Sequence, residues 1–188
     1  MNGINFTIRR PTGVFTIEFA IVALFMSGVI VFTGDMVIKQ SAQGMLDRMS
    51  YSAVSVLKER TQLYDEDSTI SASQISTLNQ IVEASLTRTM PSYDTSRFSG
   101  VYQQVSFSGD TDSPTLTETE YTQGGATQTC EPSNNLKSIA TSLSPITNED
   151  RRAPLFQVTL CYRTDNWFGE LVGEDYEWIH SNSIILGR

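Results

Sequence analysis

The most distinctive pattern along the chain is an apolar run over residues 14–32 that contains one acidic side chain, Glu18. A helix rises about 1.5 Å per residue, so this run covers roughly the 30 Å hydrocarbon core of a bilayer. An ionised carboxylate in lipid costs on the order of a few kcal/mol, so Glu18 needs a partner or a position near the interface. The run therefore predicts one membrane-spanning helix with a carboxylate near its start.

After residue 34 the apolar positions recur at spacings of three and four, which predicts one face of an amphipathic helix. These positions are Ile38, Ala42, Met45, Met49, Ala53, Val56 and Leu57. We expect one helix over residues 14–63, with 14–32 in the membrane and 33–63 outside it. Gly34 and Gly44 are soft points, because glycine costs about 1 kcal/mol relative to alanine within a helix.

A second amphipathic helix is predicted over about residues 73–89, within a linker and helix segment of residues 64–97. Its apolar stripe consists of Ile75, Leu78, Ile81, Val82, Leu86 and Met90. Ser71 or Ser73 is placed to cap its start, and Pro91 follows its end. We expect this helix to pair with the first as a hairpin. The acidic stretch 65–69 lacks the glycine and glutamate of a calcium loop and is interpreted as a solvated turn.

From residue 98 the hydrophobic period changes to two, which predicts strands. We expect a strand from 98 to 107, a second within 115–129, and two more over 155–163 and 176–186. Residues 131–152 show little periodicity, so we expect irregular surface structure there. We expect a turn and a loop over residues 165–174. The fold class is therefore α+β. A long N-terminal helix and a second helix precede a β-rich head, residues 98–188, whose antiparallel sheet is mostly polar on its outer face.

Charge and motifs argue against several classes of function. The formal charge of −8 disfavours nucleic-acid binding, which needs clustered basic residues. His180 is the single histidine, and no nucleophile motif, phosphate loop or metal-ligand spacing accompanies it. We therefore expect no enzyme activity, cofactor or metal. Trp167 and Trp178 are interpreted as sheet core or partner contacts.

Arg9 and Arg10 precede the apolar run, and residues 1–13 contain no acidic side chain. The positive-inside rule predicts a cytoplasmic N-terminus and export of the segment after residue 32. A cleaved secretory signal is the rival interpretation, but the apolar run is long for one and no Ala-x-Ala-like site follows it. In an exported domain Cys130 and Cys161 can form a disulfide worth roughly 3–4 kcal/mol, and two buried thiols are the alternative.

The unit Gly13-Val14-Phe15-Thr16-Ile17-Glu18-Phe19, between a basic leader and an apolar helix, resembles the class III signal of type IV pilins and pseudopilins. Its glycine, its glutamate five residues later and the aromatic residue after that look most like the Flp/Tad (type IVb) pilins. The long exported part is more similar to TadE and TadF pseudopilins than to the very short major Flp pilin. The size of the chain and residues 13–60 favour TadF. The specific resemblance covers about a third of the chain.

This resemblance implies that a prepilin peptidase cuts between Gly13 and Val14 and removes residues 1–13. It also implies that Glu18, followed by Phe19, pairs with the new amine of Val14 on an adjacent subunit and sets the register between subunits. The implied partners are the peptidase, TadE-like and Flp pilins, and the Tad assembly platform of the bacterial inner membrane. The implied role is in assembly or initiation of a pilus for adhesion and biofilm formation.

An uncleaved single-pass inner-membrane protein with a periplasmic binding or sensor domain accounts for the same pattern. Under that alternative Glu18 is an interfacial carboxylate that reaches the headgroups. Gly13 then belongs to an ordinary helix-entry turn after Pro11.

Overall fold

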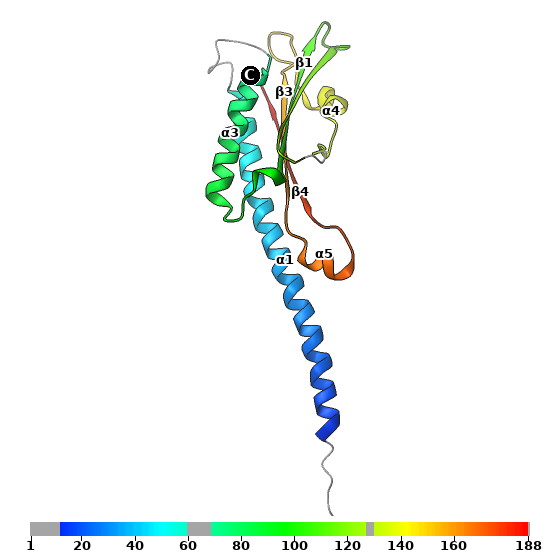
Figure 1. Ribbon diagram of the computed structural model, residues 1–188. Helices are drawn as coiled ribbons and strands as arrows, with labels where there is room; N and C mark the ends of the chain where they lie inside the picture. The colour runs from blue at the N-terminus through cyan, green and yellow to red at the C-terminus, as the bar shows by residue number, and fades with distance from the viewer. Residues whose placement is uncertain (1–11, 60–68, 127–129, 188) are drawn as a thin grey trace, which may run out of the picture. The chain divides into compact units, whose positions relative to one another are not determined.

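The computed structural model describes residues 12–59, 69–126 and 130–187 (Figure 1). In chain order its elements are α1 (Thr12–Lys58), α3 (Ala72–Thr89), the 3₁₀ helix η1 (Thr95–Arg97), β1 (Phe98–Ser108), β2 (Thr115–Gly124), α4 (Leu136–Leu143), β3 (Leu155–Arg163), α5 (Trp167–Val172) and β4 (Trp178–Leu186). The strands form one antiparallel sheet in the order β2-β1-β3-β4. The predicted α+β class, with a long apolar helix, a second helix and a small sheet, is confirmed.

The chain divides into two compact units, which are described separately below. The N-terminal unit consists of Met1–Ile38 and Asn166–Asp175. The second unit consists of Lys39–Asp165 and Tyr176–Arg188, and it is called the head from here on in place of residues 98–188. The division falls within α1, close to the position where the hydrophobic pattern changes from continuous to periodic. α5 belongs to the N-terminal unit, although the strands before and after it belong to the head.

α1 is a single helix of 47 residues that continues through both predicted soft points. A Cβ added at Gly34 or Gly44 would meet nothing within 4 Å, so packing does not require glycine at either position. The last helical residue is Lys58, whereas the sequence predicts an end near residue 63. The turn predicted at 65–69 lies outside the described residues except for Thr69.

The inner face of the sheet packs against α3 and the head portion of α1, and these elements share one hydrophobic core. Its buried residues are Ala42, Leu46, Ala53, Val54, Leu57, Ile70, Ile75, Leu78, Val82, Leu86, Met90, Phe98, Tyr102, Phe156, Val158, Leu160, Tyr162 and Ile179. Figure 1 shows α3 beside the cyan part of α1. The core explains why the second half of α1 is amphipathic, because only one side of it is covered.

The buried face of α1 contains Ala42, Ala53 and Leu57 of the predicted stripe but is rotated from it at other positions. Leu46 and Val54 are fully buried, whereas Val56, which the periodicity assigns to the stripe, is 43% exposed. The physical reason is that the buried face includes a polar residue, Ser50, which a count of apolar positions passes over. The Ser50 Oγ lies 2.8 Å from the hydroxyl oxygens of both Ser181 and Ser183 on β4.

A second polar contact joins α1 to the same strand. Gln43 Nε2 donates a hydrogen bond of 2.6 Å to the backbone carbonyl of His180. β4 is an edge strand, and one side of such a strand has no neighbouring strand to pair with its backbone groups. α1 therefore provides a hydrogen-bond partner for one backbone group of this edge strand, and it also covers the core.

α3 is attached to the sheet by a buried hydrogen bond in addition to its apolar stripe. Tyr102 Oη donates to Asn79 Oδ1 at 3.0 Å, and burial raises the pKa of the Tyr102 phenol above its ordinary value. Ser71 is the N-cap of α3, in agreement with one of the two predicted caps, and its backbone N–H donates to Gln74 Oε1 at 3.3 Å.

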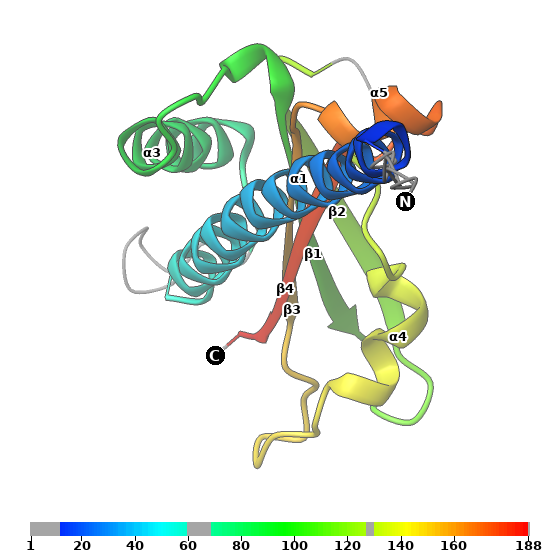
Figure 2. The ribbon, with the colours of Figure 1, turned by 90° about the horizontal axis from the view of Figure 1, so that it is seen from below.

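The outer face of the sheet carries polar side chains, as predicted, but it is covered over much of β1 and β3. Gln103, Gln157 and Thr159 are all buried. Part of the cover is α4, which replaces the irregular surface predicted for residues 131–152 and lies on the opposite side of the sheet from α3 (Figure 2). Only two residues of α4, Leu136 and Ala140, point inward, which is too few to produce a visible period.

The turn and loop predicted for residues 165–174 contain a short helix, α5. Gly173, with φ of 77°, ends it in the left-handed conformation that glycine adopts without strain. A helix of six residues with an internal glycine, Gly169, gives no helical signal in the sequence. The last strand begins at Trp178, two residues later than predicted, and the other strand bounds lie close to those expected.

The rotated face of α1 gives a testable prediction. We expect Leu46→Ala to lower the free energy of unfolding by about 2–5 kcal/mol, because it opens a cavity in the core. Val56→Ala should cost less than about 1 kcal/mol, because this side chain is largely exposed. Urea unfolding of the detergent-solubilised protein, followed by circular dichroism, measures both variants. Equal losses would contradict the observed face.

Candidate functional site: the uncovered apolar helix

The N-terminal part of α1 presents apolar side chains that are not buried within the chain. The exposed large apolar residues are Phe15, Ile17, Phe19, Ile21, Val22, Leu24, Phe25, Met26, Val29, Ile30, Val31 and Phe32. α1 is long and apolar enough to cross a membrane, and no part of its most apolar window is buried. Contiguous apolar surface of this size marks contact with lipid or with another protein. This surface is the candidate functional site.

Two acidic side chains on this part of α1 differ in their surroundings. Glu18 is exposed on the apolar surface, and its carboxylate forms no ion pair with any residue that the structure describes. Asp35, one residue past Gly34, is only 5% exposed. Glu18 is therefore an acidic group on the part of the helix that an external environment must cover.

The other predicted processing residues lie at or before the start of α1. Gly13 and Val14 belong to the first turn of the helix. Arg9 and Arg10 lie outside the described residues. Glu18 and Phe19 follow one turn further along, so α1 carries Gly13, Val14, Glu18 and Phe19 as one continuous segment. Their roles in cleavage and register stay predictions.

α5 provides a contact within the N-terminal unit that sequence reasoning missed. The ring of Phe168 meets the ring of Phe32 edge to face, with the centroids 4.8 Å apart and an interplanar angle of 69°. Such a geometry is favourable for aromatic pairs. The Trp167-Phe168 pair inside an otherwise polar turn is the sequence signal that would have indicated a packing role.

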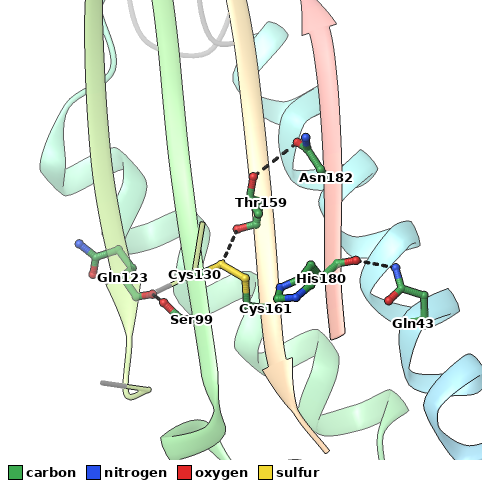
Figure 3. The surroundings of a disulfide bond; sticks show 8 residues. All are labelled: Gln43, Ser99, Gln123, Cys130, Thr159, Cys161, His180 and Asn182. Atoms are coloured by element: carbon green, nitrogen blue, oxygen red, sulfur yellow. Dashed lines mark hydrogen bonds between the residues drawn. A yellow bond between two sulfur atoms is a disulfide. The ribbon is translucent and has the colours of Figure 1, made fainter. Parts of the chain in front are cut away.

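The predicted disulfide between Cys130 and Cys161 is present (Figure 3). Cys161 is fully buried on β3, where its register neighbours are Ser99 on β1 and His180 on β4. Cys130 lies in the segment after β2, with its Sγ 3.8 Å from the Thr159 carbonyl oxygen. The bond ties this segment to the middle of the sheet, and together with α4 it covers the outer face.

The two tryptophans have different environments. Trp178 is half-buried and packs against the cluster formed by Val101 and the disulfide. Trp167, on α5, is 57% exposed. The interpretation as a sheet-core residue therefore holds for Trp178. It does not hold for Trp167, whose ring is largely exposed.

The head also contains an open groove of about 820 Å³ on the outer face of the sheet. Its lining consists of Gln103, Glu118, Glu120, Thr122, Cys130, Glu131, Pro132, Asn135 and Lys137. Small-molecule sites are lined mostly by apolar side chains with few polar groups. The lining of this groove is mostly polar and charged, so it is not typical of a small-molecule site. Among the described residues, no group of three or more His, Cys, Asp or Glu side chains is placed to hold a metal ion. His180 is exposed, and its contact with Gln43 is made by its backbone.

An uncovered membrane-length helix that continues into a small α+β head suits a membrane-anchored protein. The family described as "Putative tight adherence pilin protein F", TadF, matches residues 7–188, and the chain belongs to this family. The match extends over the whole head, where the sequence offered no motif. No match was found among curated proteins or among solved structures. A pilin family is consistent with a structural role and with association with the membrane and other pilus components.

The disulfide gives a second prediction. The bond closes a loop with a sequence separation of 31, so removing it should lower the free energy of unfolding by about 3–4 kcal/mol on the chain-entropy estimate. We expect the double variant Cys130→Ala/Cys161→Ala to unfold at lower urea concentration than wild type. A reductant should shift the wild-type midpoint and leave that of the variant unchanged. A wild-type midpoint that resists reductant would contradict this role.

Proposed function

We propose that this protein is a minor pilin or pseudopilin of a Tad-type (Flp, type IVb) pilus that takes part in pilus assembly or initiation for adhesion and biofilm formation. The observation that carries the proposal is the TadF family match over residues 7–188, on a chain whose apolar helix surface is left uncovered. Lipid covers this surface before assembly, and helices of neighbouring subunits cover it afterwards.

The proposed topology places the N-terminus in the cytoplasm and the head in the periplasm of a bacterial inner membrane. Arg9 and Arg10, before the apolar run, support this orientation through the positive-inside rule. The disulfide between Cys130 and Cys161 also supports it, because the periplasm is oxidising and the cytoplasm is not. The subunit remains in this membrane as a single-pass protein until it enters the fibre.

Prepilin peptidase removes residues 1–13 in this proposal, between Gly13 and Val14. Both residues lie in the first turn of α1, whose backbone N–H groups have no partner within the helix. Unwinding this turn therefore breaks few hydrogen bonds, and glycine lowers the cost by about 1 kcal/mol relative to alanine. Gly13 also lets the extended chain enter a protease cleft without a side-chain clash.

Glu18 then serves as the register residue. Its carboxylate lies on the apolar surface without an ion-pair partner among the described residues, and in lipid this costs a few kcal/mol. Cleavage creates a positively charged amine at Val14, and the amine of an adjacent subunit neutralises Glu18. Opposite charges attract strongly in a medium of low dielectric constant, so the pair fixes the axial position of one helix against the next.

The partners in this proposal are prepilin peptidase, TadE-like and major Flp pilins, and the Tad inner-membrane platform. The distribution of buried residues limits where the pilin contacts occur. The apolar face of α1 from Ala42 to Leu57 is already used by the protein's own head. Contacts between subunits therefore involve mainly the stretch from Phe15 to Phe32, with Phe19 next to the register residue.

Cleavage is tested by the intact mass of the membrane-extracted protein from cells with and without a prepilin peptidase. We expect the peptidase to produce a protein that begins at Val14. Gly13→Leu should block the cut because the added side chain clashes in the protease cleft. Gly28→Leu is the matched control, since Gly28 has open space around it, and it should be cleaved normally. Retention of residues 1–13 in every strain would favour the uncleaved single-pass alternative.

The register role is tested separately from cleavage. We expect Glu18→Ala to reduce the amount of sheared pili by about tenfold or more, because the variant subunit lacks the charge that attracts the Val14 amine of its neighbour. Cleavage should stay normal. Asp47→Asn is the control and should leave pilus yield unchanged, because it removes an exposed charge from the head portion of α1 and keeps an oxygen that can accept from Gln43 Nε2. A normal yield from Glu18→Ala would remove the register role.

A further inference from the structure

α5 presents apolar side chains outward that nothing in the described chain covers. Trp167 and Leu171 are 57% and 68% exposed, and Val172 is 51% exposed. Trp167 and Leu171 are four residues apart, so they lie on the same side of the helix. Three outward apolar residues in one six-residue helix are unusual on a protein surface and need a partner of their own.

The position of α5 along α1 indicates which partner this is. Phe168 packs on Phe32, so α5 contacts α1 at the end of the apolar run. Phe32 is 17 residues beyond Phe15, which at about 1.5 Å per residue is roughly 26 Å along the helix axis. A bilayer's hydrocarbon core is about 30 Å thick, so a helix that spans it from near Phe15 brings Phe32 and α5 to the opposite boundary.

The conformation of the α5 segment is fixed by local contacts. Asn166 Nδ2 donates to the Glu174 carbonyl at 2.7 Å, which closes the segment around α5. A Cβ at Gly169 would collide with Asn166 and Glu174, so a side chain is excluded there. Gly173 ends the helix in a left-handed conformation. The outward residues are therefore held on a defined helix.

We propose that α5 is an interfacial element, in which Trp167, Leu171 and Val172 enter the headgroup boundary of the same bilayer that α1 spans. Tryptophan is enriched at this boundary, where its ring is apolar and its indole N–H can reach water. Glu170, Glu174 and Asp175 are exposed on the same segment. These carboxylates keep α5 at the surface and favour zwitterionic over anionic lipid. The inference rests on the proposed membrane anchor and adds a second contact with the membrane.

Because the chain has two tryptophans, fluorescence quenching by brominated lipid can test each position separately. Full-length protein is reconstituted in zwitterionic vesicles with bromine near either the carboxyl or the methyl end of the acyl chains. Trp178→Phe leaves Trp167 as the reporter, and we expect about twofold quenching by the shallow bromine and less by the deep one. Trp167→Phe leaves Trp178, which packs beside the disulfide and should be quenched weakly.

A third variant makes failure of the inference distinguishable from failure of the anchor. Phe25→Trp, in a chain with both native tryptophans changed to phenylalanine, reports on the middle of the apolar run and should be quenched by deep bromine. Quenching of this reporter without quenching of Trp167 would overturn the role of α5 alone. Absence of quenching at both Trp167 and the Phe25→Trp reporter would overturn the membrane anchor as well. Emission from Trp167 that shifts to the blue with protein concentration, without quenching, would assign α5 to a second copy instead.

A measurement on the unaltered sequence guards against misfolded variants. Wild-type protein labelled with 5-fluorotryptophan should give two fluorine resonances, one for each tryptophan. A lipid with a spin label at the headgroup should broaden one of them strongly, and Trp167→Phe should remove that signal. Equal broadening of both signals, or of neither, would contradict the proposal.

Discussion

The structure depends on one constraint, which is that the apolar surface of α1 from Phe15 to Phe32 cannot remain in contact with water. Transfer of apolar surface out of water is worth roughly 25 cal/mol per Å². The most apolar window of this surface is not buried within the described chain, and α5 contacts it only at its end, on Phe32. After Lys39 the same helix is amphipathic, because one side packs on the core of the head and the other side faces water. A single continuous helix therefore serves two environments, and the change in its sequence pattern marks the boundary between them.

Polar contacts orient the helices of the head on the sheet as much as apolar packing does. Ser50 meets two serines of β4, and Tyr102 donates to Asn79 of α3. Apolar side chains tolerate small rotations of a helix, whereas buried hydroxyl and amide groups require specific partners. These contacts explain why α1 turns Leu46, rather than Val56, toward the core, and why the edge of β4 is covered.

The parts of the fold that the sequence predicted are those with long periodic signals. The continuous apolar run, the stripe of α3 and the alternation in β3 each extend over enough residues to specify an element. α4 and α5 were missed because eight and six residues produce too few inward positions to establish a period. The disulfide followed from composition and the inferred compartment, but the Phe32–Phe168 contact depends on a tertiary approach between distant segments that no local pattern encodes.

The disulfide also limits how the chain can travel. Cys130 and Cys161 link two segments of the head into a closed loop. A pore wide enough for only one extended strand would not admit the head while this loop is closed. Passage of the folded head back through such a pore would therefore require reduction of the bond or proteolysis of the loop first.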